Sequence, residues 1–158
     1  MTKEFKKAMM PEYEMTDLGA MKYFLGMQVK QSPGRIFLPQ EKYVDDLLKK
    51  FNMSECKSLA TPMTLNEKLS KNDGKEKVDA SIYQSLVGSL IYLTHTRPDI
   101  VHSVSIALRF MSEPSKAHVT AAKKILRYVK GTKSYGIMYE TGKSQAYRIY
   151  RQRLGRKH

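Results

Sequence analysis

Three apolar repeats of helical period between residues 79 and 131 constrain the fold of this chain more than any other feature. Each repeat places apolar side chains three or four positions apart, which is the spacing of one buried helix face. The segments between the repeats, TRPD at 96–99 and EPS at 113–115, carry residues that end one helix and begin the next. The sequence therefore predicts three consecutive helices. Their inward positions are Tyr83, Leu86, Val87, Leu90 and Ile91, then Ile100, Val101, Val104, Leu108 and Met111, then Val119, Ala122, Leu126 and Val129.

The ends of these helices are marked by residue type. Asp79 and Ser115 are predicted N-caps, and Gly131 is predicted to end the third helix. Gly88 lies inside the first helix, where glycine costs about 1 kcal/mol relative to alanine. We therefore expect a neighbouring element to pack closely against Gly88.

The first half of the chain predicts strands as well as helices. Residues 23–31 and 35–38 are rich in strand-forming side chains and flank Ser-Pro-Gly, which predicts a β-hairpin. Residues 3–15 favour a helix that Pro11 weakens, before a turn at 16–19.

A helix is predicted over residues 40–51 and a short strand over 134–140. The expected fold class is α+β, with a β-hairpin and a short strand beside four to five helices. Residues 52–78 are polar and rich in turn formers, so we expect a polar connector that is mobile around 71–77.

The positive charge of the chain is unevenly distributed. The formal net charge is +13, but six cationic side chains and no acidic ones lie in residues 143–158, and without them the charge is +7. A second basic group lies on the outer face of the last predicted helix: Lys123, Lys124, Arg127 and Lys130. These four side chains could follow a phosphate backbone, or they could form an ordinary solvated helix face.

The residues that commonly carry enzyme chemistry are not arranged for it. The four histidines and the single cysteine share no metal-ligand spacing, and the glycines form no phosphate-binding loop. We predict no catalytic residue, no metal site, no cofactor and no small-molecule substrate.

The sequence also lacks the patterns that direct a protein to a membrane. The first fifteen residues have no apolar secretory core, and no apolar run approaches the roughly 20 residues of a membrane span. Cys56 alone permits no internal disulfide. We expect a soluble, intracellular protein that does not bind membranes.

Six sequence blocks in order resemble the polyproteins of Ty1/copia-type LTR retrotransposons, in the C-terminal part of the reverse transcriptase domain. The resemblance covers residues 3 to about 140. The blocks are YEMTDLG at 13–19, KYFLG at 22–26, ATPM at 60–63, YQSLVGSL at 83–90 with YL at 92–93, TRPD at 96–99 and AAKKILRYVKGT at 121–132.

The resemblance implies a division of the chain into parts of a reverse transcriptase fold. Residues 1–51 would be the end of the palm after the catalytic hairpin, and Phe24, Leu25, Gly26 and Met27 would belong to a primer-grip-like hairpin. Residues 52–78 would connect this part to residues 79–140, which would be thumb- and connection-like helices with a short strand. The implied partner is an RNA–DNA or DNA duplex.

Residues 43–46 spell YVDD, the tetrapeptide whose aspartates bind metal ions in reverse transcriptases. A polymerase pair needs a tight hairpin between apolar strands. Here the surrounding apolar side chains follow helical spacing, and Asp45 and Asp46 stand four residues before lysines, as in a solvated helix face. We interpret the letters as a coincidence within the predicted helix 40–51.

The last residues depart from the family pattern. The family continues into a ribonuclease H domain with a motif similar to LIGFTDSDWAGS, whereas this chain has AYRIYRQRLGRKH. One set of codons for that ending, read one base later, encodes LIGFTDSDWAGS. We therefore hypothesise that residues 141–158 are a frameshifted basic tail, disordered and with no partner of its own.

These observations lead to one interpretation and one alternative. The chain is interpreted as a truncated, catalytically incompetent fragment of a retrotransposon RNA-directed DNA polymerase that retains parts holding the template–primer. The alternative is a small basic nucleic-acid-binding module without catalysis.

Overall fold

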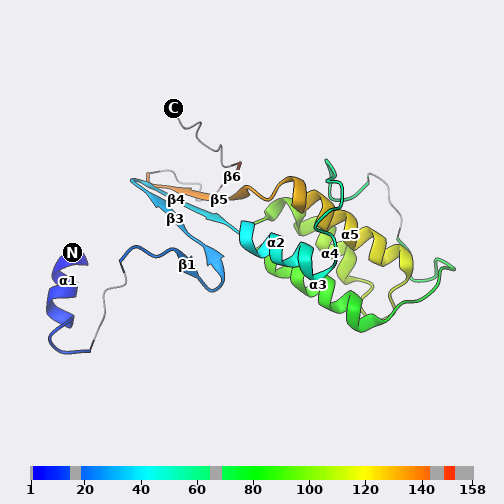
Figure 1. The fold of residues 1–158 in the computed structure, drawn as a ribbon, viewed down its shortest axis with the longest axis horizontal. Coiled ribbons are helices and arrows are strands. Elements are labelled where there is room, and N and C mark those ends of the chain that lie inside the picture. The colour runs from blue at the N-terminus through cyan, green and yellow to red at the C-terminus, as the bar shows by residue number, and fades with distance from the viewer. Residues whose placement is uncertain (1, 15–18, 65–68, 143–147, 152–158) are drawn as a thin grey trace.

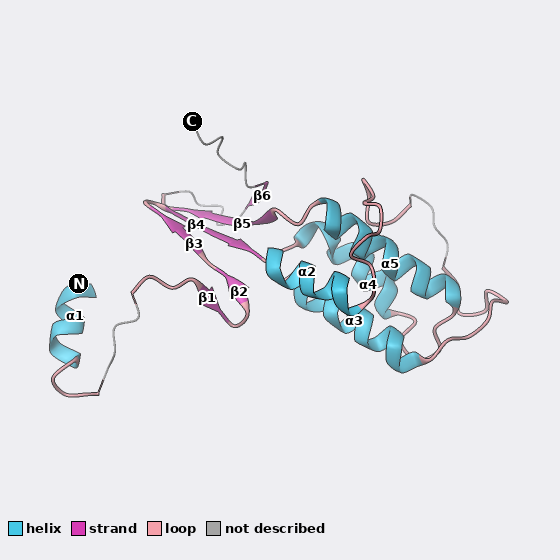
Figure 2. Ribbon diagram, viewed as in Figure 1, coloured by secondary structure: helices cyan, strands magenta, loops and turns pink. Residues whose placement is uncertain are grey.

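The computed structural model describes residues 2–14, 19–64, 69–142 and 148–151. Helices α2 to α5 gather into one bundle, and strands extend away from it (Figure 1). Figure 2 shows the same division into helical and strand regions. The helices are α1 (Thr2–Met9), α2 (Glu41–Lys50), α3 (Ala80–Thr94), the 3-10 helix η1 (Pro98–Ile100), α4 (Val101–Leu108) and α5 (Lys116–Gly131). The strands are β1 (Tyr23–Phe24), β2 (Met27–Gln28), β3 (Lys30–Ser32), β4 (Arg35–Pro39), β5 (Tyr135–Glu140) and β6 (Arg148–Arg151).

The hydrophobic core lies among α2, α3, α4 and α5, and it confirms most of the predicted inward faces. Helix α3 begins at Asp79, whose carboxylate accepts the amide hydrogen of Ser81 at 2.8 Å. Helix α5 begins with a capping box in which Ser115 and His118 bond each other's backbone amides. The buried side chains of these two helices are Tyr83, Leu86, Val87, Leu90 and Leu93 in α3, and His118, Ala121, Ala122, Ile125, Leu126 and Val129 in α5.

The inward face predicted for α4 is partly wrong. Val101 and Leu108 are 46% and 38% exposed, whereas Ile100, Val104 and Ala107 are buried. The apolar stripe of this segment is wider than the strip that α3 and α5 cover, so its edge faces outward. The close packing expected at Gly88 is also wrong, because a Cβ placed there would have no atom within 4 Å.

The strand predicted over 23–31 is broken. Leu25 and Gly26 both have left-handed φ angles, 49° and 78°, and form the two-residue turn of a β1–β2 hairpin. The expected turn at Pro33-Gly34 is confirmed and joins β3 to β4. The chain therefore has two consecutive hairpins where the pattern predicted one.

The helix predicted over 3–15 ends at Met9, before Pro11. Most of the turn expected at 16–19 falls on residues 16–18, which are outside the described residues. Helix α2 confirms the prediction for 40–51, and Asn52, at φ 54°, ends it in the left-handed conformation.

The larger sheet joins segments from both ends of the chain in the order β3-β4-β5-β6, antiparallel throughout. The predicted strand 134–140 is confirmed as β5, which pairs with β4. The disorder expected for the tail is wrong for residues 148–151, which form β6 beside β5. The mixture of helices and small antiparallel sheets fits the expected α+β class.

Candidate nucleic-acid interface

The tip of the β1–β2 hairpin, where the primer-grip-like residues were predicted, docks on helix α3. The Tyr92 hydroxyl donates a hydrogen bond to the backbone carbonyl of Leu25. A Cβ on Gly26 would lie 2.8 Å from the same hydroxyl oxygen, so this close approach requires glycine. The ring of Tyr92 meets that of Tyr43 on α2 edge-on, with centroids 4.7 Å apart. The hairpin tip is therefore positioned by two core helices.

The side chains at this tip are largely exposed. Leu25 is 74% exposed and Phe24 is 52% exposed, whereas Met27 is half-buried. Tyr23, the preceding residue of β1, adds a second exposed aromatic ring. Exposed aromatic rings offer faces on which nucleic-acid bases can stack.

The basic residues predicted on α5 are not equally available. Lys123 is exposed and Lys124 is half-buried. The Arg127 Nε atom donates to the carbonyl of Lys57 at 2.7 Å. The Lys130 Nζ atom donates to the carbonyls of Ser54 and Cys56 at 2.5 and 2.7 Å. Two of the four cations therefore fasten the segment after α2 to α5.

The structure does not bring the two predicted groups together at one site. The hairpin tip contacts α3 at Tyr92, whereas Arg127 and Lys130 face residues 54–57, beyond the opposite end of α2. A hollow of about 310 Å³ near that end is lined by further lysines that the sequence reasoning missed. Its lining residues are Asp45, Leu48, Lys49, Ser54, Lys130 and Lys133.

The YVDD letters lie within α2, as predicted. Asp45 is half-buried and Asp46 is exposed. The Asp45 carboxylate forms an ion pair with the Lys133 ammonium at 3.2 Å. Across residues 2–14, 19–64, 69–142 and 148–151, no three His, Cys, Asp or Glu side chains form a group that could hold a metal ion.

The TRPD block carries a buried ion pair rather than an interface. The Arg97 side chain is 1% exposed, and its Nε and Nη2 atoms bond both carboxylate oxygens of Asp99 at 2.9 and 2.6 Å. Its Nη1 and Nη2 atoms also bond the carbonyl and hydroxyl of Thr132 at the end of α5. Burial alone would raise the pKa of Asp99, but the hydrogen bonds and charge of Arg97 hold that pKa below its ordinary value.

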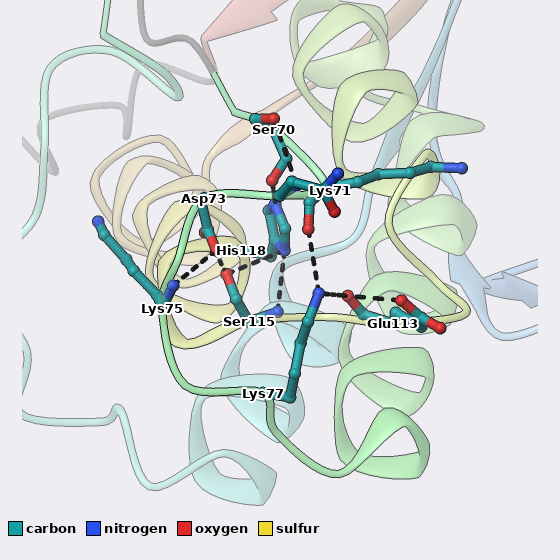
Figure 3. Close-up of polar contacts among 9 residues, drawn as sticks. Ser70, Lys71, Asp73, Lys75, Lys77, Glu113, Ser115 and His118 are labelled. Atoms are coloured by element: carbon teal, nitrogen blue, oxygen red, sulfur yellow. Dashed lines mark hydrogen bonds and ion pairs between the residues drawn. The ribbon is translucent and has the colours of Figure 1, made fainter.

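A second polar cluster attaches the predicted connector to the start of α5 (Figure 3). The Ser115 hydroxyl donates to Asp73 at 2.6 Å, and the Ser115 amide donates to His118 Nδ1 at 2.9 Å. Because Nδ1 accepts a hydrogen bond, the proton of the neutral imidazole sits on Nε2, which donates to the carbonyl of Ser70 at 3.1 Å. Burial lowers the pKa of His118.

The segment over 71–77 that was expected to be mobile is therefore held at several points. The Lys77 ammonium also bonds the carbonyls of Lys71 and Glu113, as Figure 3 shows. The Val78 amide donates to Pro114, and the Lys116 amide to Glu76. These bonds hold the segment against the N-terminal end of α5.

The sequence matches known proteins along most of its length. The profile of the family described as "Reverse transcriptase (RNA-dependent DNA polymerase)" matches residues 1–65. The Retrovirus-related Pol polyprotein from transposon RE1 of Arabidopsis thaliana is 38% identical over 138 residues, which are 87% of this chain and 9% of that polyprotein. The chain belongs to the Ty1/copia-type reverse transcriptase sequences.

Two further relatives match similar regions of this copia-type chain and are themselves shorter than the RE1 polyprotein. An uncharacterized mitochondrial protein of Arabidopsis thaliana is 43% identical over 125 residues, which are 79% of this chain and 52% of that protein. A putative transposon Ty5-1 protein of Saccharomyces cerevisiae is 34% identical over 140 residues, 87% of this chain and 46% of that protein. The copia-type chain thus spans about half the length, or less, of these relatives.

No solved structure matches the copia-type chain. Within the part of the chain that the structure describes, none of the helices is both long enough and apolar enough to cross a membrane.

Proposed function

We propose that this chain is a catalytically inactive segment of a retrotransposon reverse transcriptase that retains parts for holding a template–primer duplex. In this proposal residues 1–51 are the end of the palm, and the tip Phe24-Leu25-Gly26-Met27 contacts the primer. Residues 79–140 act as thumb- and connection-like helices, and 52–78 joins the two parts.

One observation carries the inactive part of the proposal. The only adjacent aspartates among the described residues, Asp45 and Asp46, lie on a helix, and Asp45 is paired with Lys133. Two-metal polymerase chemistry needs carboxylates that converge on ions roughly 3.5–4 Å apart. Successive residues on a helix point about 100° apart, so this pair cannot supply that geometry.

Primer extension tests the inactive part directly. The purified chain is incubated with a primed RNA template, deoxynucleotides and Mg²⁺, beside an active reverse transcriptase as the positive control. We expect no extension by the chain. Magnesium-dependent extension that persists after repeated purification would contradict the proposal.

Fluorescence anisotropy with a labelled RNA–DNA duplex tests the holding role. We expect binding that weakens with salt, and a loss of about fivefold or more in Phe24→Ser/Leu25→Ser, because base–aromatic stacking is worth about 1–3 kcal/mol. The control is Ile82→Ser, which alters an exposed apolar residue of α3 away from the tip. Equal binding by the tip variant and the control would remove the primer-grip role.

The second candidate function is a small basic nucleic-acid-binding module that uses α5. The exposure of Lys123 favours it, although Arg127 and Lys130 are already bonded to carbonyls. In this case Lys123→Gln/Lys124→Gln should weaken duplex binding more than the Phe24 and Leu25 changes do. The ranking of these two variants in one assay separates the two functions.

The basic tail is proposed to be a frameshift product. Its positive charge would then reflect the reading frame rather than selection for binding. Sequencing the genomic locus from codon 134 onward tests this directly. We expect the frame one base later to encode a motif similar to LIGFTDSDWAGS and further ribonuclease H sequence. A locus without such a frame would make the arginine-rich tail an authentic part of the protein.

A further inference from the structure

The hollow between α2 and the end of α5 is lined by three lysines from separate parts of the chain. Lys49 comes from α2, Lys130 from α5, and Lys133 from the loop that leads to β5. Leu48 and Ser54 complete the lining beside Asp45. The cluster exists only in the folded chain, which distinguishes it from a run of lysines along one solvated helix face.

Two of the three ammonium groups are held in place. Lys130 Nζ bonds the carbonyls of Ser54 and Cys56, and Lys133 Nζ lies 3.2 and 3.4 Å from the two oxygens of Asp45. The two carbonyls use two of the three N–H donors of the Lys130 ammonium, so one donor remains for a ligand. Holding the two long side chains in advance also reduces the entropy lost when a ligand binds. Asp45 is the single carboxylate among the six lining residues, so the lining carries an excess of two positive charges.

We propose that this hollow binds one phosphate group of a nucleic-acid backbone, and that the Asp45 carboxylate takes the place of the phosphate beside Lys133 when no phosphate is bound. A phosphodiester carries one negative charge and accepts several hydrogen bonds, which suits clustered ammonium donors. The proposal rests on the proposed duplex-holding function and gives it a phosphate contact at Lys49, Lys130 and Lys133, separate from the Lys123 and Lys124 of the second candidate function.

The first test removes two of the lysines. Lys130 is left unchanged because it also anchors residues 54–56. We expect Lys49→Gln/Lys133→Gln to weaken duplex binding about tenfold, with a log Kd against log salt slope shallower by about 0.9, the value for one lost phosphate contact. The control Lys7→Gln/Lys71→Gln makes the same charge change at exposed positions on α1 and in the connector. An equal loss in the control would overturn the proposal.

The second test removes the carboxylate instead. Asp45→Asn releases Lys133 and removes the one negative charge of the lining, so duplex affinity should rise about twofold to threefold. A purely structural role for the Asp45–Lys133 pair would leave affinity unchanged or lower it. Unchanged or weakened binding would therefore overturn the assignment of Asp45 as a competitor for phosphate.

Titration with inorganic phosphate, followed by the NMR shifts of backbone amides, tests the hollow separately from the proposed duplex-holding function. We expect phosphate to shift the amides of Ser54, Lys130 and Lys133 in the wild type but not in Lys49→Gln/Lys133→Gln. The wild type could bind the duplex with an affinity that neither the double substitution nor added phosphate changes. That result would overturn this site and leave the proposed function standing. Phosphate shifts without any duplex binding would overturn the proposed function and reassign the hollow to a free phosphate.

Discussion

At the scale of single residues, the buried Arg97–Asp99 pair shows what one of the sequence blocks contributes to the fold. Sequence reasoning treated TRPD as a helix break, and it is one, but Arg97 also ties that break to Thr132 at the end of α5. Tyr128 joins the same network by donating its hydroxyl to Asp99 at 2.9 Å. The pair therefore joins η1 to α5.

Replacing Arg97 should be strongly destabilising. Arg97→Met leaves the Asp99 carboxylate buried without its partner, and breaking a buried pair in this way costs about 3–5 kcal/mol. Chemical denaturation followed by circular dichroism measures the loss. The control is Lys116→Met, which breaks the exposed Lys116–Glu76 pair and should cost less than about 1 kcal/mol. Similar losses in both variants would show that burial of the Arg97 pair does not matter.

His118 should make stability depend on pH. Burial is the largest effect and lowers the pKa of His118 in the folded chain. The negative charge of Asp73 raises this pKa, whereas the positive charges of Lys77 and Lys75 lower it further. The unfolded chain therefore binds a proton more readily, so stability is full above pH 6.5 and falls as pH drops from 6.5 toward the folded pKa. The slope cannot exceed about 1.4 kcal/mol per pH unit for one group.

Denaturation curves between pH 8 and pH 5 test this dependence. His118→Gln removes the titrating ring, so its free energy of unfolding should be lower at pH 8 but fall less toward pH 5 than that of the wild type. The exposed His102 gives a matched control, because His102→Gln should keep the wild-type slope. Parallel curves for His118→Gln and the wild type would assign the pH dependence to other groups.

At the scale of elements, the helix α3 carries a glycine whose position contradicts the sequence expectation. Gly88 faces outward with open space around it, so no packing constraint requires its small size. Gly88→Ala should therefore stabilise the chain by about 0.5–1 kcal/mol through helix propensity alone. Thermal and urea denaturation measure this gain. A loss of stability would mean that another molecule or segment packs on this face.

Periodicity predicted α2, α3 and α5 because each buries one continuous face whose apolar residues repeat at helical spacing. It could not predict the break between β1 and β2, because the turn uses Leu25 at a positive φ that the residue type does not favour. It also overestimated the buried face of α4, where Val101 lies beyond the strip covered by its neighbours. These errors arise where tertiary contacts rather than local spacing decide the conformation.

The candidate sites were harder to predict than the helices. Each depends on side chains that meet across long separations in sequence, such as Lys133 with Asp45 or Tyr92 with Leu25. The sequence places four cations on the outer positions of α5, but no pattern in it indicated that Arg127 bonds the carbonyl of Lys57. Spacing along one helix cannot reveal which of its outward residues another segment covers.

At the scale of the whole molecule, stability is concentrated in the helical bundle. The fully buried apolar side chains belong to α2–α5 and η1, whereas the β1–β2 hairpin has exposed rings and few long-range bonds. The segment after α2 belongs with the bundle, because the Leu59 amide donates to Arg127 and the Val78 amide donates to Pro114. The molecule therefore consists of a well-buried part, made of the helical bundle and the segment after α2, and a more exposed part that includes the β1–β2 hairpin. This boundary does not follow the order of the segments in the sequence.

Hydrogen exchange should follow this division. Amides of α3 and α5 should exchange about a hundredfold or more slowly than those of β1 and β2, because local openings that avoid the core cost less than global unfolding. The amides of Leu59 and Val78 should be protected although they lie outside helices and strands. Exposed amides without such bonds, measured in the same spectra, provide the internal reference. Rapid exchange at both residues would restore the loose connector expected from composition. Protection would make the segments around Leu59 and Val78 part of the folded bundle.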